Sequence, residues 1–254
     1  MIGMGTFTLS RTRFYPAPIQ LPELDYNAFC QCTNERSGNY YDFIPRHSSR
    51  LAVSIGDLPA AVDAPSITIP CLEALVRGLT AGNRGDLAGL ARELNGTLYL
   101  LGPEHLCAPW FYALVDPVRH ELQYVNAGHE PPFLIRKDGA AIHRLERTGA
   151  ALGLSARASH RQETTAIEPG DVLVIFSEGL ATTLSDAGVL DIVLENPHAG
   201  MAELTRRIFD AADRSAMHSC LDEDRTVAAI RVVGACRQPV LEDRAEEGLM
   251  VCAA

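Results

Sequence analysis

Residues 50–57 read Arg-Leu-Ala-Val-Ser-Ile-Gly-Asp, and this stretch indicates both a strand and the edge where it ends. The run from 51 to 55 is short and largely apolar, which is typical of a buried β-strand. Gly56 then allows a turn, and Asp57 places a carboxylate directly beyond the strand. A carboxylate there is costly to desolvate unless a cation compensates its charge.

Two further acidic clusters adjoin strand-like runs elsewhere in the chain. Glu178 follows the apolar run 172–176, and the acids at 222–224 precede the run 227–233. Carboxylate oxygens suit hard divalent cations such as magnesium, manganese or calcium. If the three clusters converge in space, the sequence predicts a cage for such cations.

The composition is that of an ordinary globular protein, with 47% hydrophobic and 21% charged residues in 254. No apolar stretch approaches the roughly 18 residues of a membrane span, and residues 1–16 lack the features of a signal peptide. We therefore expect a cytoplasmic protein without a membrane segment. We expect one domain over residues 1–234 and a polar, acidic tail over 235–254.

The net charge of -10 argues against a nucleic-acid partner, which would require a basic face. A phosphorylated substrate would need local positive charge, which bound metal ions can provide. The seven cysteines include no Cys-x-x-Cys pair. Free thiols are therefore expected rather than disulfides or a structural zinc site.

The remaining pattern alternates strands and turns around two groups of helices. Helices are expected at 72–79, 86–101 and 200–217, with Pro65 and Pro70 breaking or kinking the segment before the first. Four strand pairs are expected around turns at 47–49, 116–117, 138–139 and 168–170. The strand at 226–233 has the apolar composition of a central strand. This arrangement predicts an α+β layered fold.

Five stretches occur in an order that is typical of one protein family. They are Ser-Gly-Asn-Tyr-Tyr-Asp-Phe at 37–43, Ile-Gly-Asp at 55–57, Tyr-Val-Asn-Ala-Gly-His-Glu-Pro-Pro at 124–132, Pro-Gly-Asp at 169–171 with Ser-Glu-Gly at 177–179, and Glu-Asp-Arg-Thr at 223–226. Together they resemble the SpoIIE/RsbU-type serine/threonine phosphatases of the metal-dependent (PPM, type 2C-like) protein phosphatase superfamily. The resemblance runs from about residue 16 to residue 233.

This resemblance implies a four-layer α-β-β-α sandwich, in which two antiparallel sheets are flanked by helices. It also implies a centre of two Mn²⁺ or Mg²⁺ ions at one edge, and hydrolysis of phosphoserine or phosphothreonine by a metal-activated water. Substrates in this family are often phosphorylated anti-sigma antagonist proteins of bacterial signalling switches.

The resemblance assigns Asp57 as the bridging metal ligand, with the carbonyl of Leu58 beside it. Glu178 stands where the family has the Asp of Thr-Asp-Gly, and Glu223 where it has the first Asp of Asp-Asp-x-Thr. Asp57, Glu178 and Glu223 are thus the expected catalytic residues. Asp224 is the reserve metal ligand, because the register within the acids at 222–224 stays open.

Asn39 stands where the family has an Asp ligand, and it is either a weak ligand or a structural residue. Asn126 and His129 are expected to support the ligands from the surrounding shell; His129 acts either as a general acid or as a turn residue. Asp42 is expected to support the first strand pair. Arg36 either binds the substrate phosphate or lies on the surface.

The substituted ligands leave three readings of the function. The first is a serine/threonine phosphatase, and the second is a pseudophosphatase that keeps the fold as a protein-binding module. The third is an enzyme that hydrolyses a small phosphoester. Glu for Asp moves a carboxylate by about one bond length, and Asn for Asp removes a charge, so the ligand positions discriminate among them.

Overall fold

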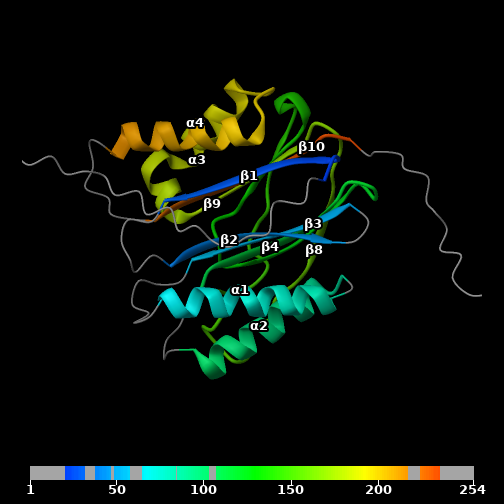
Figure 1. Cartoon of the computed structure of the whole chain (residues 1–254), viewed down its shortest axis with the longest axis vertical. Helices are drawn as coiled ribbons and strands as arrows, with labels where there is room; N and C mark the ends of the chain where they lie inside the picture. Colours follow the sequence, from blue (N-terminus) through cyan, green and yellow to red (C-terminus); the bar gives the residue numbers. More distant parts are fainter. Residues whose placement is uncertain are drawn as a thin grey trace, which may run out of the picture.

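Two five-stranded antiparallel sheets pack face to face between two layers of helices (Figure 1). In this computed structural model the described residues are 21–31, 38–46, 49–57, 65–83, 85–102, 107–216 and 224–234. The α+β layered fold expected from the residue pattern, and the four-layer α-β-β-α sandwich implied by the family resemblance, are confirmed. None of the helices in these ranges is long and apolar enough to cross a membrane.

The first sheet has the strand order β1-β10-β9-β6-β7 and is covered by α3 and α4. Its elements are β1 (Leu24–Gln31), β6 (Phe133–Ile135), β7 (Ile142–Arg144), β9 (Val172–Phe176), β10 (Arg225–Val232), α3 (Glu178–Glu195) and α4 (Met201–Ala216). Strand β10 lies between β1 and β9, so the prediction of a central final strand is confirmed.

The second sheet has the order β2-β3-β4-β5-β8 and is covered by α1 and α2. Its elements are β2 (Asn39–Arg46), β3 (Arg50–Asp57), β4 (Trp110–Asp116), β5 (Glu121–Ala127), β8 (Glu163–Ala166), α1 (Pro65–Gly82) and α2 (Leu87–Leu101). A short 3₁₀ turn, η1 (Lys137–Gly139), joins β6 to β7 in the first sheet.

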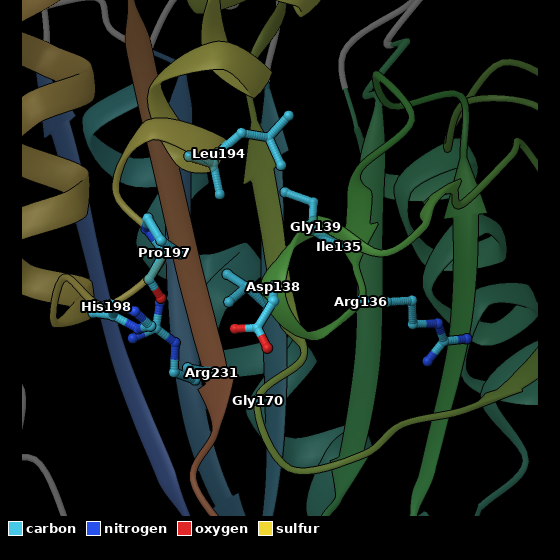
Figure 2. A pocket seen from close by; sticks show the side chains of 11 residues that line it. Ile135, Arg136, Asp138, Gly139, Gly170, Leu194, Pro197, His198 and Arg231 are labelled. Carbon is cyan, nitrogen blue, oxygen red and sulfur yellow. The ribbon is translucent and has the colours of Figure 1, made fainter.

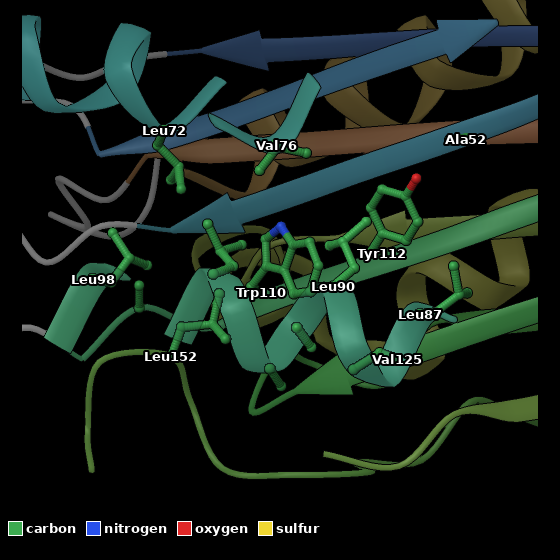
Figure 3. Packing of buried hydrophobic residues seen from close by; sticks show 14 of the residues in the cluster. Ala52, Leu72, Val76, Leu87, Leu90, Leu98, Trp110, Tyr112, Val125 and Leu152 are labelled. Atoms are coloured by element: carbon green, nitrogen blue, oxygen red, sulfur yellow. The ribbon is translucent and has the colours of Figure 1, made fainter. Parts of the chain in front are cut away.

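Strand alternation sorts the side chains of the second sheet into an inner and an outer face. On β3, Val53 and Ile55 face the first sheet, whereas Ala52 packs toward the helices. The outer cluster around Trp110 and Tyr112 fills the space beneath α1 and α2 (Figure 3). The central strands β4 and β9 are therefore buried on both faces, which explains why they are almost entirely apolar.

Three of the predicted strand pairs are confirmed, and one is wrong. Strands β2 with β3, β4 with β5, and β6 with β7 form the expected hairpins. The segments around the turn at 168–170 do not pair, because β8 joins β5 in one sheet and β9 joins β6 and β10 in the other. The turn is a crossing between sheets: β8 is a mostly exposed edge strand, whereas β9 is wholly buried.

One expectation about the helices needs correction, and one helix was missed. Helix α1 starts at Pro65 and continues through Pro70, so Pro70 does not end it. Helix α3 was not predicted at all.

The expected tail at 235–254 lies outside the described residues. Cys30, Cys71 and Cys107, which fall within them, form no disulfide.

Candidate functional site

The candidate site lies at one edge of the sandwich, where the start of β2 and the end of β3 in the second sheet approach the start of β10 in the first. Asn39 begins β2 and lies opposite Asp57, the last residue of β3. Because Ile55 faces the inner layer, Asp57 two residues later lies on the same side. Asn39 is buried, with 1% of its surface exposed, while Asp57 is partly buried. The main-chain N–H of Asp57 donates to the carbonyl of Pro109 at 3.0 Å.

Hydrogen bonds from Asn39 tie this edge to the start of β10. The Asn39 Nδ2 donates to the main-chain oxygen of Asp224 (3.2 Å) and to the hydroxyl of Thr226 (3.1 Å). The N–H of Gly38 donates to the Asp224 carboxylate at 3.2 Å. The structure thus brings together Asn39, Asp57 and Asp224, three of the predicted metal ligands, from opposite ends of the sequence.

The end of β9 joins the same edge through Ser177. Its N–H donates to the carbonyl of Thr226 at 2.9 Å, and the Thr226 N–H donates to the Ser177 hydroxyl at 3.0 Å. Glu178 follows as the first residue of α3 and is exposed. A carboxylate in the first turn also interacts favourably with the helix dipole.

The described residues do not complete a metal centre by themselves. Within the described ranges no three His, Cys, Asp or Glu side chains lie close enough together to hold a metal ion. Leu58, Glu223 and Arg36 lie outside those ranges. Their assignments as metal ligands and as a phosphate contact therefore stay predictions.

His129 is a buried histidine whose ring is fixed by the chain that follows it. Its Nδ1 lies 2.8 Å from the carbonyl of Glu130, and because a carbonyl only accepts, Nδ1 carries the proton. Burial, with a smaller contribution from the charge of Arg147, lowers the pKa of His129 to about 4. The imidazole is thus neutral near pH 7. This geometry favours the turn role over the general-acid role.

Asn126 holds the segment after β7 to the sheet. Its Nδ2 donates to the carbonyl of Leu145 (3.1 Å), and its N–H donates to the hydroxyl of Thr148 (3.0 Å). In register, Asn126 lies opposite Phe111, which in turn pairs with Ile55 of β3. Asn126 therefore supports a neighbouring segment, two strands away from the strand that carries Asp57.

Asp42 lies on the opposite face of the sheet from the candidate site. Both of its oxygens accept hydrogen bonds from Arg77 of α1, at 2.6 and 2.7 Å, and its surface is 1% exposed. Strand alternation places it beside Tyr40, which also faces the helices. The structure does not bring Asp42 to the metal ligands; it anchors α1 to β2.

Ser177 and Thr226 are site residues that the sequence reasoning did not assign. Both are buried, with 2% and 0% of their surfaces exposed, and each forms hydrogen bonds across the edge. The available signal was a small polar residue beside an apolar run, since Ser177 follows 172–176 and Thr226 precedes the run that starts at 227. Arg225 points the other way, toward α4, and binds Asp213 at 2.7 Å.

A separate cavity of about 300 Å³ lies at the other end of β10 (Figure 2). Arg231 lines it, and its guanidinium donates to the carbonyls of Pro197 and Ala199, both at 2.8 Å. These bonds fix the loop between α3 and α4. The cavity is thus remote from Asn39 and Asp57, which lie by the start of β10.

Comparison with known proteins assigns the chain to a family. Residues 49–233 match the family model described as Stage II sporulation protein E (SpoIIE), which is more than half of the sequence. The chain belongs to the SpoIIE family. The matched range contains Asp57, Glu178 and the residues at 223–226.

The SpoIIE-family chain is also similar to curated relatives and to solved structures. It is 25% identical over 199 residues to phosphoserine phosphatase RsbU of Bacillus subtilis (strain 168), covering 74% of this chain and 57% of RsbU. The RsbU and RsbW domains of a Mycobacterium tuberculosis protein superimpose with a TM-score of 0.68 at 21% identity, over 82% of this chain and 59% of that chain.

The catalytic domain of the serine/threonine protein phosphatase PstP, solved in complex with two manganese ions, gives a TM-score of 0.63 at 17% identity. That match covers 83% of this chain and 98% of the other. At these identities the structural likenesses show the fold, which is that of the PPM (PP2C-type) phosphatases. The SpoIIE-family chain spans little more than half the length of RsbU.

Proposed function

We propose that the chain is a metal-dependent phosphatase that hydrolyses phosphoserine or phosphothreonine in proteins. The observation that carries this proposal is the convergence of Asn39, Asp57 and Asp224 at one edge between the sheets. Membership of the SpoIIE family and the name of the relative RsbU support it.

The donor atoms at this edge fit a hard divalent cation. Asp57 and Asp224 supply carboxylate oxygens, and Asn39 supplies an amide oxygen, a set that suits Mn²⁺ or Mg²⁺. We propose that these residues hold the metal together with Glu178, Glu223 and the carbonyl of Leu58. When bound, such ions lower the pKa of water and neutralise charge on phosphoryl oxygens.

The chain's own residues would arrange the substrate around that centre. Ser177 is bonded to Thr226 of β10, and these bonds fix the start of α3, where Glu178 lies. Neutral His129 is no proton donor near pH 7, because its Nδ1–H is already given to a carbonyl. We propose that Arg36 contacts the transferred phosphoryl group.

We propose a phosphorylated protein of the anti-sigma antagonist type as the substrate. The Mycobacterium tuberculosis structure is described as joining RsbU and RsbW domains, which supports a protein partner in a signalling switch. The net charge of -10 argues against nucleic acid as a partner. A cytoplasmic location is part of the same proposal.

A second candidate function is a pseudophosphatase that binds a partner without turnover. Two observations favour it: the exposed position of Glu178 and the neutral amide at Asn39. Both functions require the same fold, so the metal centre decides between them. A third possibility, hydrolysis of a small phosphoester, is distinguished from protein dephosphorylation by comparing the rates on an aryl phosphate and on a phosphoserine peptide.

The decisive experiment measures hydrolysis of an aryl phosphate and of a phosphoserine peptide, with and without Mn²⁺. Asp57→Asn should lower the metal-dependent rate at least about a hundredfold, because it removes a charged ligand. Asp42→Asn is the matched control, since it makes the same change on the outer face. Equal rates in wild type and Asp57→Asn, or no activity with any divalent ion, would exclude the phosphatase.

A further inference from the structure

Thr226 lies where β10, β9 and β2 meet. Its side chain is completely buried, and by strand alternation it faces the inner layer, as Ala228 and Ile230 do. Both main-chain polar groups of Thr226 are bonded to Ser177, the residue before Glu178. A change at Thr226 therefore acts on two segments that carry predicted metal ligands.

The hydroxyl of Thr226 has a defined direction. It accepts a hydrogen bond from Nδ2 of Asn39 at 3.1 Å and donates one to the sulfur of Cys30 at 3.0 Å. The second Nδ2 proton goes to the main-chain oxygen of Asp224. Since that oxygen can only accept, the nitrogen end of the amide must face β10, and the oxygen end is turned away from that strand.

We propose that Thr226 is a positioning residue for the candidate metal centre. Its hydroxyl orients the carboxamide of Asn39 so that the oxygen is presented at the edge shared with Asp57. This inference rests on the proposed function, and it assigns the orientation of one ligand to a residue that contacts no metal. Partners that orient a ligand typically change metal affinity about 10- to 100-fold when removed.

Thr226→Val tests this, because valine keeps the shape of threonine but cannot accept from Asn39. We expect the Kd for Mn²⁺, measured by calorimetry, to rise at least about tenfold, while Thr226→Ser should stay close to wild type. Thr80→Val is the matched control. Thr80 is equally buried and its hydroxyl bonds Tyr112 on the helix side of the sheet, so its loss should leave the Kd unchanged.

A double-mutant cycle with Asn39→Ala shows whether Thr226 acts through Asn39. In the Asn39→Ala protein, adding Thr226→Val should change the Kd for Mn²⁺ little further. Additive effects, or a Thr226→Val protein that binds Mn²⁺ as tightly as Thr80→Val, would overturn the inference and leave the phosphatase proposal standing. A wild-type protein that binds neither Mn²⁺ nor Mg²⁺ would overturn both.

Discussion

Strands β2 and β3 carry acids on both of their faces, and the two faces use them differently. On the outer face, Asp42 is sealed beneath α1 and neutralised by Arg77. On the inner face, Asp57 lies at the open edge of the sandwich opposite Asn39. The two acids lie on adjacent strands of one sheet, so the face that each one occupies separates the acid that anchors a helix from the proposed metal ligand.

The largest effect on stability is expected when the outer acid loses its cation. Arg77→Met removes the cation that binds both oxygens of the buried Asp42 carboxylate, which should lower the free energy of unfolding by about 3 kcal/mol. Urea denaturation measures this, with Arg92→Met on the exposed side of α2 as the control. Adding Asp42→Asn should recover part of the loss. A loss no greater than that of the control would show that the two faces do not differ in this way.

His129 is buried like Asp42, but its ring bonds a main-chain carbonyl and no ion pair of His129 is seen among the described residues. Its pKa of about 4 in the folded protein lies below the ordinary value of 6.5, so the unfolded chain binds more protons between these values. The free energy of unfolding should therefore fall as pH decreases from 6.5 toward 4, by up to about 1.4 kcal/mol per pH unit. Above pH 6.5 this group contributes no slope.

His129→Asn keeps a nitrogen donor near the Nδ1 position and removes the titration. The difference in unfolding free energy between wild type and this variant should vary with pH only below 6.5. A constant difference from pH 4 to 8 would mean that His129 is accessible to protons in the folded protein. The conclusion that burial lowers the pKa of His129 would then be wrong.

Asn39→Asp sharpens the comparison by placing a third charge on the inner edge. Aspartate cannot donate to Asp224 or Thr226, so without metal the protein should lose about 1–2 kcal/mol of stability. With Mn²⁺ the added charge should tighten binding and raise Tm above that of the wild type. Thermal melts with and without Mn²⁺ separate the two effects. If Mn²⁺ affinity is unchanged, Asn39 is not a ligand position.

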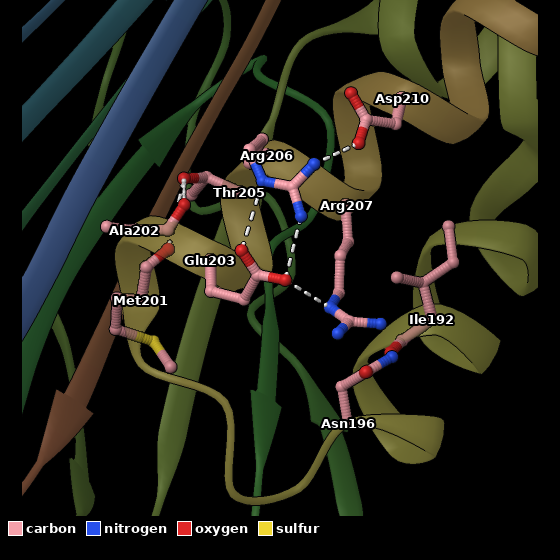
Figure 4. A network of polar contacts seen from close by, with 9 residues as sticks. All are labelled: Ile192, Asn196, Met201, Ala202, Glu203, Thr205, Arg206, Arg207 and Asp210. Carbon is pink, nitrogen blue, oxygen red and sulfur yellow. Dashed lines mark hydrogen bonds and ion pairs between the residues drawn. The ribbon is translucent and has the colours of Figure 1, made fainter.

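The smallest effect is expected on the exposed surface of α4. There Glu203 binds Arg206 and Arg207, and Arg206 also binds Asp210 (Figure 4). Because these groups are solvated, Glu203→Gln should not change Tm beyond the error of the measurement at physiological salt. A clear drop would show that ion pairs on this surface matter as much as the pair beneath α1.

Much of the fold was predictable because local pattern and tertiary environment agree. The hairpin of β2 and β3 follows from two strand-like runs around a short polar turn, and the register then places Asn39 opposite Asp57. For the candidate metal site, the sequence indicated only that several acids adjoin the ends of strands. The face that each acid occupies follows from the alternation of side chains along a strand, but only after one apolar residue such as Ile55 is known to face the inner layer.

The errors arose where local pattern and tertiary environment diverge. Helix α3 is interrupted at Ser185, whose φ of 61° breaks the helical path, so its apolar residues follow no single stripe. The crossing at 168–170 has the residues of a hairpin turn, but the buried β9 and the exposed β8 belong to different sheets. The roles of Ser177 and Thr226 depend on partners more than 40 residues away.

The central place of β10 in the first sheet also affects how the protein is made. Strands β1 and β9 have no common neighbour until residues 225–232 have been synthesised, and Asn39 has no partner on that strand before then. The second sheet, by contrast, is complete after β8. A chain synthesised only as far as residue 216 therefore has every strand of the second sheet but lacks a central strand of the first. Because Asn39 bonds to Asp224 and Thr226, the same missing segment also leaves the candidate site incomplete.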